Sequence, residues 1–141
     1  KGLSLALEFD KNLPKMLYGD EVRIKQIITN ILANAVKYTE KGIVTFSIGF
    51  KKISEEPDKI ILLVSVKDTG IGIPKEHQNR IFERFYRVDK SRSKETGGTG
   101  LGLAIVKHIT AVHEAELILN SEPEKGTDVK ILFGNTNTAK E

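Results

Sequence analysis

The sequence predicts a single α/β domain with about five strands and about three helices. At 141 residues the chain is long enough to bury one hydrophobic core. Alternating apolar residues and β-branched runs mark the strands, which we expect at 3–9, 43–50, 59–67, 116–120 and 127–133. Helical periodicity and a proline in a first turn mark the helices, which we expect at 21–38, just after Pro74, and from the glycines at 97 to about 109.

The composition is that of a globular protein with a mild positive charge. Hydrophobic residues make up 39%, charged residues 29%, and the net charge is +3. The absence of cysteine excludes disulfides and Cys-based metal sites. No apolar run has membrane-spanning length. The sequence begins without Met inside a predicted strand, so we expect it to be a piece of a longer protein.

The helix predicted over 21–38 carries a narrow polar stripe beside its apolar one, with Asp20 as its N-cap. The polar stripe recurs every three or four residues, at Arg23, Gln26, Asn30, Asn34 and Lys37. A solvated face would more typically carry Glu and Lys, because Asn is a mediocre helix former. Two Asn at i and i+4 could hold a hydrated cation. A functional face is therefore favoured, and a solvated face is the alternative.

The segment Asp68–Pro74 (DTGIGIP) follows the strand that we expect to be central. An ionised carboxylate only accepts hydrogen bonds, so Asp68 suits an exocyclic amine such as that of adenine. Gly70 and Gly72 would let a base lie against the backbone. The alternative is a plain strand-to-helix turn capped by Asp68.

The segment Gly97–Ile109 (GGTGLGLAIVKHI) places four glycines at the start of a helix. A glycine-rich helix start presents N–H groups to an anion such as phosphate. An ordinary flexible loop before a core helix is the alternative. Residues 89–99 lack large apolar side chains, so we expect either a mobile lid over phosphates or a loop without a role.

Four segments stand in one order: NxxxNAxKYT, DTGIGIP, IFERFYR and GGTGLGLAIVKH. Together they resemble the N, G1, F and G2 boxes of the ATP-binding catalytic domain of bacterial sensor histidine kinases, a family grouped with gyrase, Hsp90 and MutL. The resemblance runs from Leu3 to Phe133. It implies a two-layer α/β (α+β) sandwich of the Bergerat type, a mixed sheet packed on helices, with ATP and Mg²⁺ as cofactors. We expect the domain over 1–133 and a polar, frayed tail over 134–141.

The resemblance also implies roles for individual residues. Asn34 resembles the magnesium-binding amide, and Asp68 resembles the adenine-recognising carboxylate. Asn30, Lys37 and Arg87 resemble residues that act at the phosphates. The nucleotide-binding set implied is Asn30, Asn34, Lys37, Tyr38, Asp68, Gly70, Gly72, Ile73, Tyr86, Arg87, Gly98, Thr99, Gly100, Leu101, Gly102 and Leu103.

The implied activity is phosphoryl transfer to a histidine rather than hydrolysis. Hydrolases of the larger group place Glu four residues before the N-box Asn, where this chain has Asn30, and an amide cannot act as the base that activates water. No phosphoacceptor box is present, and we interpret His77, His108 and His113 as structural or surface residues. An anti-sigma-type serine kinase and a nucleotide-binding scaffold without catalysis are the alternatives.

Two features depart from the family pattern. A Gly pair usually follows the equivalent of His113, whereas Glu114 follows here, which leaves the ending of that helix open. Asp128 stands in the last strand where a small hydroxyl is common. In the segment IFERFYR, aromatic residues at this spacing are more often part of a core than of a ligand site, so we assign Phe82 and Phe85 to packing.

The resemblance further implies partners and a location. We expect a helical phosphoacceptor and dimerisation domain of the same parent protein and a cognate response regulator as partners, and no nucleic acid. The parent is expected to be a membrane-anchored homodimer with this domain in the cytoplasm, and the isolated piece a monomer.

Overall fold

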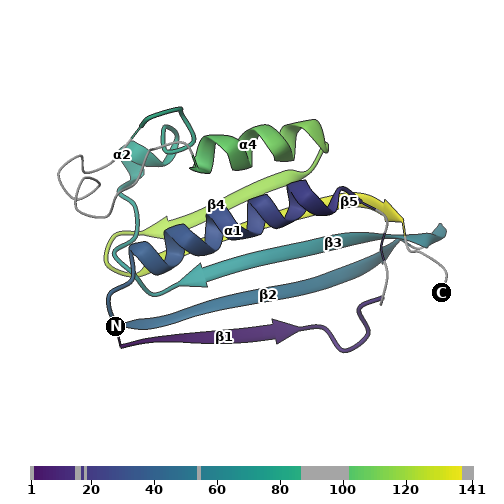
Figure 1. Cartoon of the computed structure of the whole chain (residues 1–141), viewed down its shortest axis with the longest axis horizontal. Coiled ribbons are helices and arrows are strands. Elements are labelled where there is room, and N and C mark those ends of the chain that lie inside the picture. The colour runs from purple at the N-terminus through teal and green to yellow at the C-terminus, as the bar shows by residue number, and fades with distance from the viewer. Residues whose placement is uncertain (1, 15–16, 18, 54, 87–101, 138–141) are drawn as a thin grey trace.

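A computed structural model shows one five-stranded sheet with helices packed on one face (Figure 1). The structure describes residues 2–14, 17, 19–53, 55–86 and 102–137. The strands are β1 (Leu3–Phe9), β2 (Gly42–Ile53), β3 (Glu56–Asp68), β4 (Glu116–Glu122) and β5 (Gly126–Asn137). The helices in this part of the chain are α1 (Glu21–Lys37), the short α2 (Lys75–Gln78) and α4 (Gly102–Val112).

The sheet is mixed, with the order β1-β2-β3-β5-β4. β1 pairs with β2 in parallel, and the remaining neighbours are antiparallel. β3, which was expected to be central, lies between β2 and β5. The predicted α/β sandwich with a mixed five-stranded sheet is therefore confirmed.

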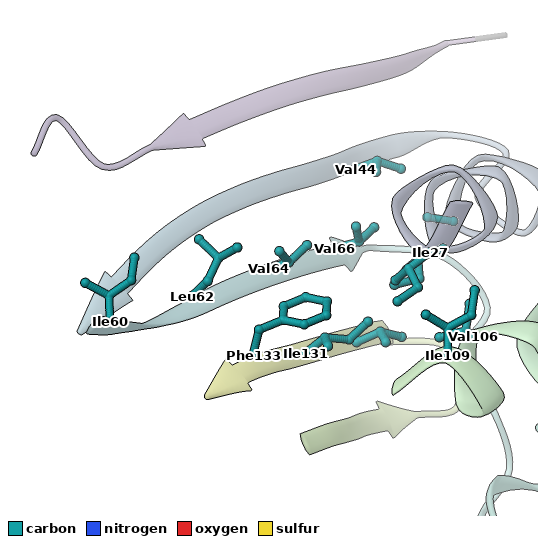
Figure 2. Packing of buried hydrophobic residues seen from close by; sticks show 13 residues of the cluster. Ile27, Val44, Ile60, Leu62, Val64, Val66, Val106, Ile109, Ile131 and Phe133 are labelled. Carbon is teal, nitrogen blue, oxygen red and sulfur yellow. The ribbon is translucent and has the colours of Figure 1, made fainter. Parts of the chain in front are cut away.

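The core lies between the sheet and the two longer helices (Figure 2). α1 is held at its start by Asp20, whose carboxylate accepts the N–H of Arg23 at 3.1 Å, as an N-cap does. The apolar stripes of α1 and α4 meet the inner side chains of the strands. The core includes Ile27, Ile31, Ala35, Val44, Val64, Val66, Val106, Ile109 and Ile131. Burying these apolar side chains against one face fixes the two helices on the same side of the sheet.

β1 is less buried than its alternating pattern predicted. Leu5, Leu7 and Phe9 are 61%, 57% and 51% exposed. β1 forms an edge of the sheet, and α1 and α4 lie over the other strands (Figure 1). Only Leu3 of this row packs against the core, while Phe9 contacts Phe46 edge-on with 5.5 Å between ring centres.

Several strands extend beyond their predicted limits. The polar segment 51–58 was expected to be a loop, but β2 and β3 continue into it, with a register shift between Lys52 and Ile53. β5 runs past Phe133 to Asn137, which pairs with Lys59, so residues 134–137 of the expected frayed tail belong to a strand instead. Pairing of neighbouring strands satisfies backbone N–H and C=O groups whether or not the side chains are apolar, so strands can outrun their hydrophobic pattern.

The ending of α4 explains how the chain manages without the usual glycine pair. The N–H of Ala115 donates to Thr110 O at 2.8 Å, and the N–H of Glu114 donates to Ala111 O at 3.1 Å. These two bonds form a Schellman motif, in which Glu114 takes the left-handed conformation (φ 53°) that glycine normally adopts. The left-handed conformation is unfavourable by about 1–2 kcal/mol for a residue with a Cβ, and the two hydrogen bonds of the motif oppose this cost.

Candidate functional site

Asp68 lies at the end of β3 and is 8% exposed. Its Oδ1 accepts the backbone N–H of Gly70 at 2.9 Å and that of Thr127, on β5, at 3.2 Å. These two donors fix the carboxylate between the turn that follows β3 and the start of β5. A buried acceptor with a fixed orientation is the kind of group that recognises a hydrogen-bond donor on a ligand.

Several groups act on the charge of this carboxyl. Burial raises the pKa of Asp68 above its usual value, and the charge of Asp128 adds to that rise. The N–H groups of Gly70 and Thr127 and the nearby hydroxyl of Thr39 oppose it. The pKa is raised on balance, so an additional hydrogen-bond donor from a ligand would relieve an unfavourable buried charge.

The C-terminal end of α1 packs directly against the turn after Asp68. The N–H of Ile71 donates to Tyr38 O at 3.4 Å. A Cβ on Gly70 would lie 2.4 Å from Tyr38 O and 2.7 Å from Thr39 Oγ1, so no side chain fits there. Gly70 is therefore required by this close approach, and its predicted contact with a base stays a prediction.

Gly72 is required for a different reason. Its φ of 70° is left-handed, and a Cβ there would lie 1.9 Å from the carbonyl oxygen of Glu122, the last residue of β4. The next residue is also held at the end of β4, because the N–H of Ile73 donates to Ser121 Oγ at 2.8 Å. Gln78 of α2 donates to both Ile73 O and Ser121 O. The backbone of 68–73 is thus held between α1 and the β4–β5 hairpin.

The polar stripe of α1 is partly buried rather than fully solvated. Gln26, Asn30, Asn34 and Lys37 are each half-buried. The amide Nδ2 of Asn30 donates to the carbonyl oxygen of Gly102, the first residue of α4, at 3.4 Å. The start of α4, with Gly102 and Leu103, therefore lies beside this stripe. The side chain of Asn34 makes no hydrogen bond within the described part of the chain, and the Lys37 ammonium lies 5.2 Å from the centre of the Tyr38 ring.

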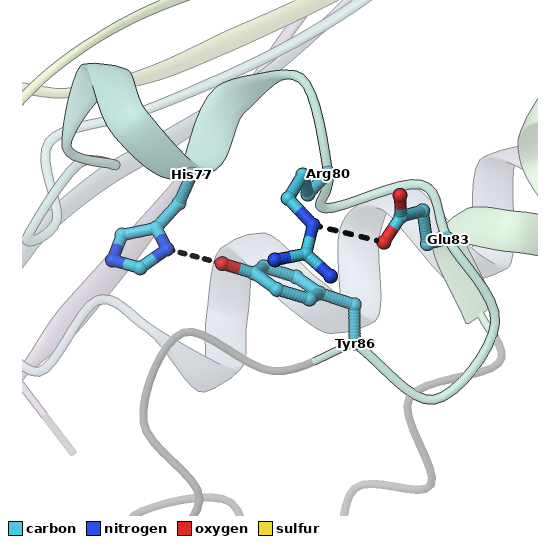
Figure 3. Close-up of polar contacts among 4 residues, drawn as sticks. All are labelled: His77, Arg80, Glu83 and Tyr86. Atoms are coloured by element: carbon cyan, nitrogen blue, oxygen red, sulfur yellow. Dashed lines mark hydrogen bonds and ion pairs between the residues drawn. The ribbon is translucent and has the colours of Figure 1, made fainter.

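Tyr86 belongs to a small polar cluster with α2 (Figure 3). Its hydroxyl contacts His77 Nδ1, and the guanidinium of Arg80 lies 4.6 Å from the ring centre. Arg80 Nε also pairs with Glu83 at 3.1 Å. This cluster fixes Tyr86 relative to α2, and the predicted nucleotide contact of Tyr86 stays a prediction.

The assignment of Phe85 to packing is wrong. The side chain is 63% exposed, and the backbone is left-handed with φ 65°. The guanidinium of Arg84 lies 5.8 Å from its ring centre. Phe82, by contrast, is half-buried. Helical spacing of aromatic residues misled the prediction, because residues 79–86 form successive turns rather than a helix.

Comparison with known proteins identifies the family. Residues 19–136 match the model of the family described as "Histidine kinase-, DNA gyrase B-, and HSP90-like ATPase". The chain belongs to this family. The resemblance drawn from the four sequence segments is thereby confirmed.

The relatives of this ATPase-family chain are longer proteins. Over 133 residues it is 46% identical to sensor histidine kinase YkoH of Bacillus subtilis, covering 94% of this chain and 27% of YkoH. It is 47% identical over 127 residues to sensor histidine kinase WalK of the same species, covering 87% of this chain and 20% of WalK. The crystal structure of full-length ShkA in complex with AMPPNP superposes on 99% of this chain and 27% of its own with a TM-score of 0.79, at 31% identity. The chain thus spans about a quarter of the length of these proteins.

Part of the predicted site of this family member lies outside the described residues. This applies to Arg87, Gly98, Thr99, Gly100 and Leu101, and to the expected lid at 89–99. Within the described residues, no group of three or more His, Asp or Glu side chains could hold a metal ion. None of the helices seen there is long and apolar enough to cross a membrane.

Two residues near Asp68 were missing from the predicted set. Thr127 supplies one of the two N–H groups on the carboxylate, and Thr39 lies next to it with no exposed surface. The position of Thr39 directly after Tyr38, at the end of the NxxxNAxKYT segment, was the available signal. A pocket of about 320 Å³ opens on the same turn, lined by Tyr38, Glu40, Lys41, Thr69, Gly70, Ile71 and Glu124.

The raised pKa of Asp68 predicts how stability should depend on pH without nucleotide. Between the ordinary carboxyl pKa near 3.8 and the higher native value, the folded state binds more protons than the unfolded state, so stability falls as pH rises through that window. Asp68→Asn cannot titrate. The stability of Asp68→Asn relative to wild type should therefore be highest at neutral pH and should fall as the solution is acidified, because only the wild type gains stability from protonation of Asp68. Urea unfolding at constant ionic strength measures this difference. A difference that grows in favour of Asp68→Asn on acidification would contradict the assignment.

Proposed function

We propose that this chain binds ATP with Mg²⁺ and transfers the γ-phosphoryl group to a histidine on a separate dimerisation and phosphoacceptor domain of its parent protein. The parent would act in two-component signalling with a cognate response regulator. The family match and the sensor histidine kinases among its relatives support this proposal. A nucleotide would supply the phosphoryl group, and the metal would neutralise charge on the phosphates.

The observation that carries the proposal is the buried carboxylate of Asp68. Its Oδ1 is occupied by two backbone donors, and Oδ2 has no hydrogen bond within the described residues. A second carboxylate oxygen of this kind accepts from an exocyclic amine, which adenine has at C6 and guanine does not. The site therefore fits an adenine nucleotide.

The amides of α1 fit the phosphate end of the ligand. Asn34 offers a hard amide oxygen of the kind that Mg²⁺ binds, with the remaining ligands coming from phosphates and water. Asn30 donates its N–H to Gly102 O, so its amide holds the start of α4 and does not act as a base. An amide in this position favours phosphoryl transfer over rapid hydrolysis.

The described histidines do not fit the role of phosphoacceptor. His77 contacts the Tyr86 hydroxyl, and His113 Nδ1 contacts Ile109 O at 3.0 Å. His108 lies exposed on α4, and the residues that follow it do not resemble a phosphoacceptor box. We therefore propose that the acceptor histidine lies on another domain. This chain spans only about a quarter of the length of its relatives, so they have room for such a domain.

Phosphoryl transfer in trans tests the proposed function. The chain alone should bind ATP, hydrolyse it slowly and leave itself unlabelled. Mixed with the helical domain of its parent, it should label one histidine there, weakly, because the covalent link that normally raises the effective concentration is missing. The phosphoryl group should be labile in acid and stable in alkali. An acid-stable product on Ser or Thr would instead indicate a serine kinase, rapid phosphate release an ATPase, and ATP binding without transfer a scaffold.

The magnesium role of Asn34 predicts a metal-dependent loss of affinity. Asn34→Ala should weaken ATP binding by about tenfold or more in Mg²⁺, because a charge-assisted contact is worth about 1.5–3 kcal/mol. With EDTA present, the same substitution should have little effect. Asn120→Ala, on an exposed position of β4, serves as the matched control. Calorimetry that finds equal losses with and without the metal would show that Asn34 acts through packing instead.

A further inference from the structure

Thr39 carries a polar group that the fold leaves unsatisfied. The residue has no exposed surface, and its Oγ1 is the one buried side-chain N or O atom in the described part of the chain that has no hydrogen-bond partner. A buried hydroxyl without a partner is unfavourable, and such atoms in native proteins call for an explanation. Packing alone would be served as well by valine, which has the same shape without the hydroxyl.

The neighbours of this hydroxyl indicate its purpose. A Cβ placed on Gly70 would lie 2.7 Å from Thr39 Oγ1 and 3.1 Å from Asp68 Oδ1, so both oxygens border the same point. The hydroxyl does not satisfy regular hydrogen-bond geometry toward Asp68, yet it lies close enough to lower the pKa of that carboxyl. A hydroxyl hydrogen can turn toward an acceptor, so the Thr39 hydroxyl is a candidate donor to this carboxylate.

We propose that Thr39 is a positioning residue for adenine recognition: its hydroxyl donates to the Asp68 carboxylate and keeps it oriented as an acceptor for the exocyclic amine. This inference rests on the proposed nucleotide-binding function. Thr39 connects the end of α1 to the recognition carboxylate at the end of β3. The substrate class that it favours is a purine nucleotide with an amine, rather than an oxygen, at C6.

Charged groups around Asp68 define how this role depends on pH. Asp128, on β5, raises the pKa of Asp68, and Asp128 is itself bound by the Ser65 hydroxyl at 3.1 Å and lies 3.6 Å from the Lys130 ammonium. The backbone N–H groups of Gly70 and Thr127 act in the opposite direction, as does Thr39. Removing the Thr39 hydroxyl should therefore move the protonation of Asp68 to higher pH, and removing the Asp128 charge should move it to lower pH.

Calorimetric titration of ATP and GTP between about pH 5 and pH 8 tests the inference, with the same Mg²⁺ concentration throughout. Thr39→Val should weaken ATP binding by about tenfold at neutral pH, reduce the preference for ATP over GTP, and shift the acid loss of ATP binding to higher pH. Thr39→Ser should behave like wild type. Asp128→Asn should shift the acid loss in the opposite direction. Titration of the nucleotide phosphates is common to all proteins and cancels in these comparisons.

Thr110→Val is the matched control, because Thr110 is also buried, at 3% exposure, but its hydroxyl already donates to Lys107 O at 2.8 Å, away from Asp68. It should lower stability and leave the pH profile and the nucleotide preference unchanged. If wild type binds ATP and Thr39→Val retains its affinity and pH profile, the inference is overturned. If Thr39→Val and Thr39→Ser lose affinity equally without a pH shift, Thr39 only packs, and the inference is also overturned. A wild-type chain that binds no adenine nucleotide would refute the proposed function itself.

Discussion

The Asp68 carboxylate accepts backbone N–H groups from two parts of the chain that are far apart in sequence, Gly70 and Thr127. This arrangement ties the turn after β3 to the start of β5. The price of placing an acceptor there is a buried negative charge, which raises the pKa of the carboxyl. A ligand that donates a hydrogen bond would offset part of this cost. The burial that makes the charge unfavourable therefore also makes the carboxylate suited to bind a hydrogen-bond donor.

α1 connects the two ends of the candidate site. Near its middle, Asn30 holds the carbonyl of Gly102 at the start of α4. At its C-terminal end, Tyr38 O and Thr39 pack against Gly70 and Ile71 beside Asp68. The helix itself is fixed by apolar contacts with the sheet. The distance between the proposed base-recognition end and the proposed phosphate end is thereby set by the rise of a single helix.

The sequence predicted elements whose side-chain pattern matches their burial, such as α1 and β3, because periodicity reports which face meets the core. The sequence-based prediction of burial failed where it depends on which other elements lie next to a side chain. The row of Leu5, Leu7 and Phe9 looks buried by pattern, but β1 is an edge strand, and the described helices α1 and α4 lie over the other strands. The aromatic spacing around Phe85 suggested packing, and the backbone turns that expose it are not visible in a pattern.

The sequence allowed candidate site residues to be proposed, but it did not reveal how they pack. Asp68 and the asparagines of α1 were proposed from residue type and spacing. The reasons for Gly70 and Gly72 were not, because these depend on how closely Tyr38 O and Glu122 O approach. Thr39 was missed although it ends the NxxxNAxKYT segment, because its importance follows only from its complete burial beside a carboxylate.

Direct comparison of ATP with inosine triphosphate, titrated into the wild-type chain with Mg²⁺, tests the central claim that Asp68 recognises the exocyclic amine. The two nucleotides share their phosphates and ribose, and inosine carries an oxygen at C6 that would face the acceptor-only carboxylate. Leaving a buried charged acceptor without its donor costs about 1–3 kcal/mol or more, so ATP should bind at least about fivefold more tightly. Equal affinities in calorimetry would contradict the account.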